Sequence, residues 1–170
     1  MNITTSEAVW FLPFVLPICI WVALTDLKMM KILNISVMTL AAVFVVVGFF
    51  VLPFDVYMWR LLHLVIVLPI GIVINAAGLV GAGDAKFTAA AAPFIAVGDL
   101  RLLLVILAAS LLFGFAAHRI AKHTPLRRLA PDWESWSRGK KFPMGLCLGA
   151  TLTIYLGLGA LYGDIGLTEF

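Results

Sequence analysis

The chain of 170 residues is 63% hydrophobic and only 12% charged, with a mean hydropathy of +1.09. Typical soluble domains carry about 25% charged residues, so this composition excludes an ordinary water-soluble protein and predicts a polytopic membrane protein. The net charge of +3 does not indicate a nucleic-acid partner, because the basic residues are grouped in the way that membrane topology produces. We therefore expect an all-α membrane bundle of about six transmembrane helices, forming one integral-membrane domain over residues 1–170.

Apolar runs separated by polar or glycine-rich links are the predicted spans. They cover residues 8–24, 35–52, 61–80, 85–97, 102–117 and 142–162. The first span is expected to be retained rather than cleaved as a signal peptide, because Glu7 is the only charge before it and Lys28 and Lys31 follow it. The fourth span is short: a helix of roughly 13 residues covers about 20 Å of a hydrocarbon core about 30 Å thick. We interpret it as a thin or tilted crossing rather than a re-entrant segment. Without this crossing, the last basic loop would lie on the outer face, against the positive-inside tendency.

The links are predicted as polar loops or turns. They cover residues 25–34, 53–55, 98–101 and 118–141, and an acidic tail follows at 163–170. Tyr57, Trp59, Trp133 and Trp136 are expected at the membrane interface. Asn75 is expected to bond to a neighbouring helix.

The basic residues predict the orientation of the chain in the membrane. With both termini outside, the inner loops hold ten of the twelve Lys and Arg residues, namely Lys28, Lys31, Lys86, Arg119, Lys122, Arg127, Arg128, Arg138, Lys140 and Lys141. Arg60 and Arg101 remain outside, as the positive-inside tendency favours. The same count places Asp26 and Asp84 on the cytoplasmic side of the membrane.

Two acids at one membrane face are the candidate site. Asp84 ends the stretch Gly81-Ala82-Gly83-Asp84, and Asp26 follows the first apolar run. An ionisable residue at a membrane span is a functional candidate by default. Two close carboxylates can share one proton, so that the ionised acid deprotonates a water while the neutral acid polarises a scissile carbonyl. Gly81 and Gly83 would permit close approach of a substrate, and a helix starting near Asp84 would favour its ionised form.

Neither a metal nor an organic cofactor is implied. Cys19 and Cys147 lie within apolar runs and lack CxxC spacing, so we expect them to face lipid or to pack between helices.

The motifs around the acids resemble those of the type IV prepilin and preflagellin peptidases, which are membrane aspartic proteases with a GxGD motif. Here that motif is Gly81-Ala82-Gly83-Asp84, followed by Ala85-Lys86. The family's partner motif is an Asp after the first span, and here Asp26-Leu27-Lys28 with Lys31-Ile32-Leu33-Asn34 resembles it. The stretch Phe142-Pro143-Met144-Gly145, running into Gly149-Ala150, is similar to a third, weaker family pattern. The chain departs from the family at Leu33, where many members have Pro, and at Met144 and Leu146.

The resemblance implies that Asp26 and Asp84 are the catalytic pair. It also implies that Gly81, Gly83, Lys86, Lys28 and Asn34 shape the approach of the substrate. For Lys86 and Lys28 the simpler interpretation is a lysine that extends its amine to the membrane surface. The inserted methyltransferase domain of longer members carries paired CxxC zinc motifs that this chain lacks, so it resembles the short, peptidase-only kind associated with tight-adherence (Flp) pili. Archaeal preflagellin peptidases are the nearest alternative.

The substrate implied by the resemblance is a prepilin. Its short basic leader would be removed at the cytoplasmic face of the inner membrane of a prokaryote. The other expected partners are membrane lipid and either a second copy of the chain or the pilus assembly machinery.

Other interpretations remain open. Asp26 alone suits a helix cap neutralised by Lys28 or Lys31, and Asp84 alone suits a structural turn. A presenilin-like intramembrane protease has a GxGD motif but a Tyr-Asp partner and more spans, whereas Thr25-Asp26 is expected in a loop here. A small proton or cation transporter would place its acids near the middle of the bilayer. Asp99 is expected to be dispensable for catalysis.

Overall fold

The computed structural model describes residues 1–137 and 142–164. Three of the predicted inner basic residues, Arg138, Lys140 and Lys141, lie outside the described residues. The part of the acidic tail from 165 to 170 also lies outside them.

The described chain is all-α, as predicted. Its helices are α1 (Thr5–Met29), α2 (Asn34–Val51), α3 (Phe54–Ala76), α4 (Ala82–Ala91), α5 (Leu100–His123) and α6 (Met144–Tyr162). Short 3₁₀ helices join them: η1 (Ala92–Phe94), η2 (Val97–Asp99), η3 (Pro125–Leu129) and η4 (Glu134–Trp136). Over residues 1–137 and 142–164 the only extended pairing is a single bridge between Thr4 and Asp164, which ties the start of the chain to the end of α6.

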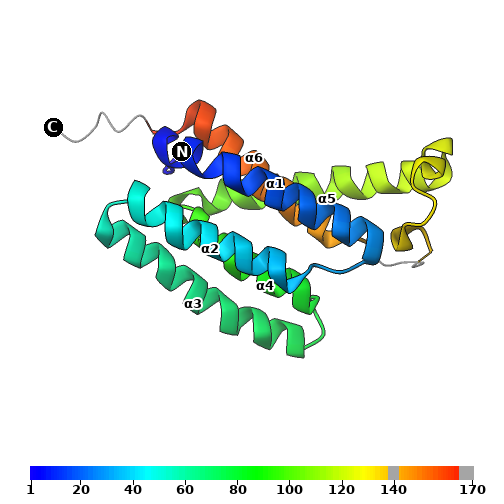
Figure 1. The fold of residues 1–170 in the computed structure, drawn as a ribbon, viewed down its shortest axis with the longest axis horizontal. Helices are drawn as coiled ribbons and strands as arrows, with labels where there is room; N and C mark the ends of the chain where they lie inside the picture. The colour runs from blue at the N-terminus through cyan, green and yellow to red at the C-terminus, as the bar shows by residue number, and fades with distance from the viewer. Residues whose placement is uncertain (138–141, 165–170) are drawn as a thin grey trace.

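Five of the helices are long and apolar enough to cross a membrane, so the chain is a multi-pass membrane protein. Successive helices run in alternating directions, and both ends of the described chain lie at the same end of the bundle (Figure 1). The segment of α4, η1 and η2 returns the chain between α3 and α5 (Figure 1). The short fourth element predicted from the sequence is therefore present, and it begins at Ala82 rather than Ala85.

The long helices extend beyond the apolar runs that predicted them. The first helix continues to Met29, so Asp26 lies in a helix and not in a loop. The third begins at Phe54, directly after Pro53, so the predicted turn at 53–55 is largely helical. The fifth continues to His123, into the predicted loop. A helix of 25 residues is about 37 Å long, which exceeds a hydrocarbon core of about 30 Å and carries its polar end out of the core.

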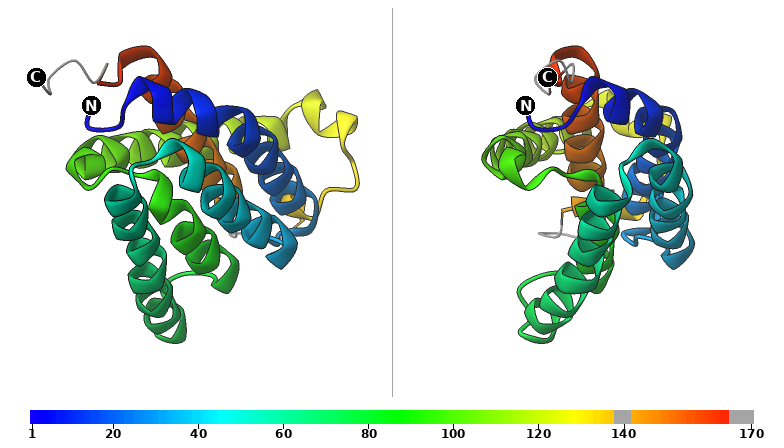
Figure 2. Two further views of the ribbon diagram at one scale, coloured as in Figure 1. Left: turned by 60° about the vertical axis from the view of Figure 1, so that its left-hand side comes forward. Right: turned by 90° about the vertical axis from the view of Figure 1, so that its left-hand side faces the viewer.

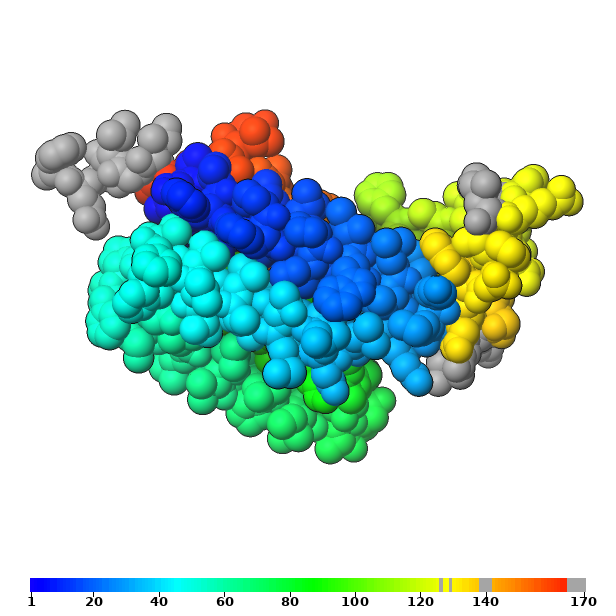
Figure 3. Space-filling model, viewed as in Figure 1, coloured from blue at the N-terminus to red at the C-terminus, as the bar shows by residue number. Residues whose placement is uncertain are grey.

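The helices form two groups. Contacts join α1, α5 and α6 on one side and α2, α3 and α4 on the other, with α1 against α2 and α4 against α6 connecting them. Figure 2 shows α3 projecting away from the group that contains α6. Figure 3 shows one face of the molecule, on which α1, α2 and α3 form the greater part, with parts of α5 and α6 at the margin.

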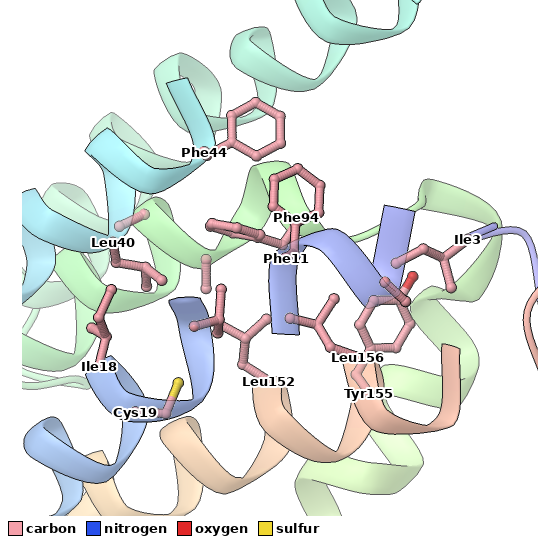
Figure 4. Packing of buried hydrophobic residues seen from close by; sticks show 14 of the residues in the cluster. Ile3, Phe11, Ile18, Cys19, Leu40, Phe44, Phe94, Leu152, Tyr155 and Leu156 are labelled. Atoms are coloured by element: carbon pink, nitrogen blue, oxygen red, sulfur yellow. The ribbon is translucent and has the colours of Figure 1, made fainter. Parts of the chain in front are cut away.

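Aromatic side chains fill the space where the two groups meet. The fully buried rings of Phe11, Phe44 and Phe94 contact one another, with centroids 5.0 to 5.6 Å apart (Figure 4). Tyr57 was expected at the interface, but it is 7% exposed, stacks on Phe44 and donates a hydrogen bond to the Val45 carbonyl. Trp59 is exposed. Edge-to-face and offset stacked rings add to the free energy gained by burial, and here they join α1, α2 and η1.

Close contact between α1 and α6 depends on small residues. A Cβ added to Gly149 would lie 3.0 Å from the backbone oxygen of Cys19. Cys19 and Cys147 are both buried, and the Cys147 thiol donates to the Ser110 carbonyl at 3.1 Å. Both cysteines therefore pack between helices, one of the two predicted roles. Small residues at such interfaces allow helix backbones to approach closely in a membrane.

Candidate aspartate-pair site

Asp26 and Asp84 line the same pocket, which has a volume of about 710 Å³. The pocket lies at the end of the bundle where α1 ends and where α4 and α6 begin (Figure 1). Three segments far apart in sequence supply its walls: residues 30–34, residues 78–84, and the side chains of Phe142 and Met144. The structure thus brings together the two acids and all three sequence patterns noted above.

The Asp26 carboxylate is held by the start of α6. It is 5% exposed, and its Oδ2 accepts a hydrogen bond from the Gly145 N–H at 2.6 Å. Neither Lys28 nor Lys31 forms an ion pair with it within the described residues. The Asp26 side chain therefore caps a helix, as one interpretation of it alone proposed, but the helix is α6 and neither of these lysines neutralises the acid. The helix that carries Asp26 ends about one turn later, at Met29. Its C-cap, Met30, has a left-handed backbone (φ 52°) and donates its N–H to the Asp26 carbonyl.

Gly145 is matched to this contact by its lack of a side chain. A Cβ there would lie 2.9 Å from the Asp26 Oδ2, 3.1 Å from the Asp26 Cβ and 3.1 Å from the Ile32 Cδ1. Gly145 is the second residue of α6, where a backbone N–H has no acceptor within its own helix. A glycine at this point therefore lets a free helix-terminal donor reach the buried acid.

Asp84 lies in the first turn of α4 and is half-buried. A Cβ on Gly81 would lie 2.6 Å from the Asp84 Oδ2, and one on Gly83 would lie 3.1 Å from the Ile32 Cβ. The two glycines therefore make room for the Asp84 carboxylate and for Ile32, a role that the sequence interpretation assigned to the approach of a substrate.

The protonation of Asp84 follows from its surroundings, and this residue lies outside the five candidate spans. Burial is the largest effect, and the negative charge of Asp26 is the second; together they raise the pKa of Asp84 to about 6, against the opposing Gly81 backbone N–H. The backbone donor at the start of α4 favours the ionised form of Asp84, as expected, but burial and the charge of Asp26 outweigh it, so the pKa is raised overall.

The other residues of the motifs take different positions. Asn34 and Lys31 line the pocket, whereas Lys28 and Lys86 do not. The Lys86 amine donates to the Asn34 side-chain oxygen at 3.1 Å and so joins α4 to the start of α2 at the pocket edge. Lys28 and Lys86 are exposed, as expected of lysines at a membrane surface.

Asn75 acts within its own segment rather than between helices. Its side chain donates to the Val80 carbonyl at 2.7 Å, which closes the turn between α3 and α4. Gly78 in this turn has φ +75°, a conformation that side chains with a Cβ rarely adopt. The prediction that Asn75 bonds to a neighbouring helix is therefore wrong. Asn75 instead shapes the loop that leads into Gly81.

Asp99 lies at the opposite end of the bundle, and its burial was not expected. It is 5% exposed and accepts hydrogen bonds from the Asn2 N–H at 2.8 Å, the Ile3 N–H at 3.0 Å and the Tyr155 hydroxyl at 2.9 Å. The nearby pair of Glu7 and Arg60 was also missed. Nothing in the local sequence marks these partners, because they meet only when distant segments pack.

Trp136, one of the two tryptophans of the predicted basic loop, does not lie at the membrane interface as expected. Trp136 is buried, donates from its indole nitrogen to the Ala130 carbonyl at 2.7 Å and stacks between His118 and Trp133. This stack anchors the loop to the end of α5.

Within residues 1–137 and 142–164, no cluster of three or more His, Cys, Asp or Glu side chains is arranged to hold a metal ion. Comparison of the chain with protein-family models, with curated proteins and with solved structures finds no match.

Proposed function

We propose that this protein is a membrane aspartic endopeptidase that removes the short basic leader of a prepilin, of the Flp type, at the cytoplasmic face of a prokaryotic inner membrane. The observation that carries the proposal is the pocket that Asp26 and Asp84 share, built from the ends of separate helices. Two carboxylates in one partly buried pocket suit hydrolysis by a water that one acid activates while the other polarises the carbonyl.

The placement of the pocket supports a substrate at the membrane surface. The described basic residues other than Arg60 and Arg101 belong to the end of the bundle that holds the acids, namely Lys28, Lys31, Lys86, Arg119, Lys122, Arg127 and Arg128. A basic excess is typical of the cytoplasmic side. A site there meets the junction between a charged leader and the hydrophobic segment of a pilin precursor.

The same placement argues against a transporter. A carrier of protons or cations needs its acids near the middle of the bilayer, whereas Asp26 lies in the last turn of α1 and Asp84 in the first turn of α4. The expected loop position of Asp26 no longer separates this chain from presenilin-like proteases, because Asp26 belongs to a helix. Cleavage of a prepilin just before its hydrophobic segment, rather than within a transmembrane helix, distinguishes the two peptidases.

The test is co-expression with a candidate prepilin in a host that lacks such a peptidase, following the leader by gel shift. We expect Asp26→Asn and Asp84→Asn each to slow cleavage by a factor of about 100 or more, since positioned acid–base groups contribute about 10² to 10⁴ to a rate. Asp132→Asn is the matched control, because Asp132 is exposed and does not line the pocket. Cleavage at the unmodified rate in either pocket variant would contradict the proposal.

A further inference from the structure

The two acids of the pocket have unequal surroundings. Asp26 is almost fully buried and accepts a short backbone hydrogen bond from the first turn of the 19-residue helix α6. A hydrogen bond donated to a carboxylate favours its ionised form. The N-terminus of a helix also carries partial positive charge that favours an anion. Asp84 is more exposed, and its carboxylate lies against Gly81, where a Cβ would approach its Oδ2 to 2.6 Å.

We propose that Asp26 is the ionised partner of the pair, positioned by the Gly145 N–H, and that Asp84 is the partner that carries the proton. This assignment rests on the proposed function and deepens it. Gly145 is then a positioning residue that acts through Asp26 and does not itself touch the reacting atoms.

The assigned roles give a balanced reaction. The Asp26 carboxylate takes a proton from a water, the water oxygen bonds to the scissile carbonyl carbon, and Asp84 gives its proton to the carbonyl oxygen. The C–N bond then breaks as Asp26 returns its proton to the leaving nitrogen and Asp84 takes a proton back from one hydroxyl of the intermediate. The products are a carboxylic acid and an amine, and both acids return to their starting states.

The shift of Asp84 is consistent with this assignment. With a pKa of about 6, Asp84 keeps its proton to a higher pH than an ordinary aspartic acid does. The negative charge of Asp26 contributes to this rise in pKa. Other titratable side chains near the pair are Lys31, which lines the pocket, Lys86, which bonds to Asn34 at the pocket edge, and Cys147, which lies within reach of the Asp26 charge. None of these three is a carboxylic acid that could take the place of Asp84.

Infrared spectroscopy of the purified protein tests the assignment without any need for peptidase activity. We expect a protonated-carboxyl band that titrates near pH 6 in the unmodified protein, disappears in Asp84→Asn and persists in Asp26→Asn. In Asp26→Asn its midpoint should move to lower pH, because a neighbouring negative charge is gone. A band that is lost in Asp26→Asn and kept in Asp84→Asn would reverse the roles. A protein with no pocket carboxyl proton held above the ordinary value of about 3.9 would also overturn the assignment.

A kinetic comparison of two glycines tests the positioning role. Gly145→Ala places a Cβ 2.9 Å from the Asp26 carboxylate, whereas Gly157→Ala, about three turns further along α6, places a Cβ where no neighbouring segment lies within 4 Å. We expect Gly145→Ala to lower kcat by about 10- to 100-fold with little change in KM, since a misplaced catalytic group costs up to about 10² in rate. Gly157→Ala should leave kcat close to its original value.

The outcomes separate the two proposals. Equal losses of kcat in Gly145→Ala and Gly157→Ala would show that the loss does not arise at the Asp26 contact, and the positioning role would fail. Prepilin cleavage together with reversed infrared assignments would overturn the roles and leave the proposed function standing. The expected infrared result without cleavage of any prepilin would overturn the proposed function and leave the roles standing.

In the unmodified enzyme, kcat/KM should fall as pH rises through about 6. The sign follows from the proton on Asp84, which is present below its pKa and lost above it. A rate that rises across this range would contradict the assigned role of Asp84.

Discussion

Asp99 shows how much one buried side chain can hold together. Its carboxylate is the acceptor for two backbone N–H groups of the N-terminus and for the Tyr155 hydroxyl, whose oxygen in turn accepts from the Ala96 N–H at 3.1 Å. The sequence predicts Asp99 in an outer turn and dispensable for catalysis, but it does not indicate these buried contacts. The packed structure makes it a link between the N-terminus, η2 and α6.

We predict that Asp99→Asn lowers the free energy of unfolding by about 2–3 kcal/mol, because an amide cannot accept all of these hydrogen bonds and turns its own donors toward them. The measurement is unfolding of the detergent-solubilised protein by SDS, followed by circular dichroism. Asp132→Asn, an exposed acid, should change the same free energy by less than about 0.5 kcal/mol. Matching curves for the two variants would refute the anchoring role.

At the scale of elements, the pair of Glu7 and Arg60 fixes α1 against α3. Their side chains are 11% and 6% exposed, and the Arg60 Nη2 donates to the Glu7 Oε2 at 2.7 Å. The backbone N–H of Glu7 is also bound by the Thr4 hydroxyl oxygen, so the first turn of α1 is held at two points. These two helices have no direct sequence signal for pairing.

We predict that Arg60→Met alone costs about 3–5 kcal/mol of stability, because it leaves the Glu7 carboxylate buried without its partner. The double variant Glu7→Gln with Arg60→Met should cost less than the sum of the two single variants, since the uncompensated charge is then absent. The same SDS unfolding assay gives all three values for the double-mutant cycle. Strictly additive effects would show that the pair does not couple α1 to α3.

At the scale of the whole molecule, the alternating helices place the acid pocket and most of the described basic residues at one end, with both ends of the described chain at the other (Figure 1). This arrangement leads to a prediction about orientation. Asp55 and His123 are exposed residues near opposite ends of the bundle, and neither lines the pocket.

We expect a membrane-impermeant maleimide to label Asp55→Cys in intact cells and to label His123→Cys only after the cells are permeabilised. The native cysteines provide little background, because both are buried. The positive-inside tendency is the physical reason for this orientation. Labelling of His123→Cys in intact cells would place the pocket on the outer face and contradict cleavage at the cytoplasmic side.

The amino-acid sequence was enough to predict the membrane class, the number and order of the helical elements, and the common end of Asp26 and Asp84. These properties follow from the length of the apolar runs and from counting crossings, and both are local or nearly local. Composition could not locate the helix ends, because backbone hydrogen bonding continues past the last apolar residue, as it does through Asp26.

The contacts of each acid could be found only from the packed helices. The Gly145 N–H reaches Asp26 across 119 positions in the chain, and Asp99 binds the N-terminal amides across 97 and 96 positions. Such contacts depend on which faces of α1 and α6 meet and on how closely small residues let them approach. The pattern of residues marks a glycine at position 145, but packing alone makes its N–H the partner of a catalytic candidate.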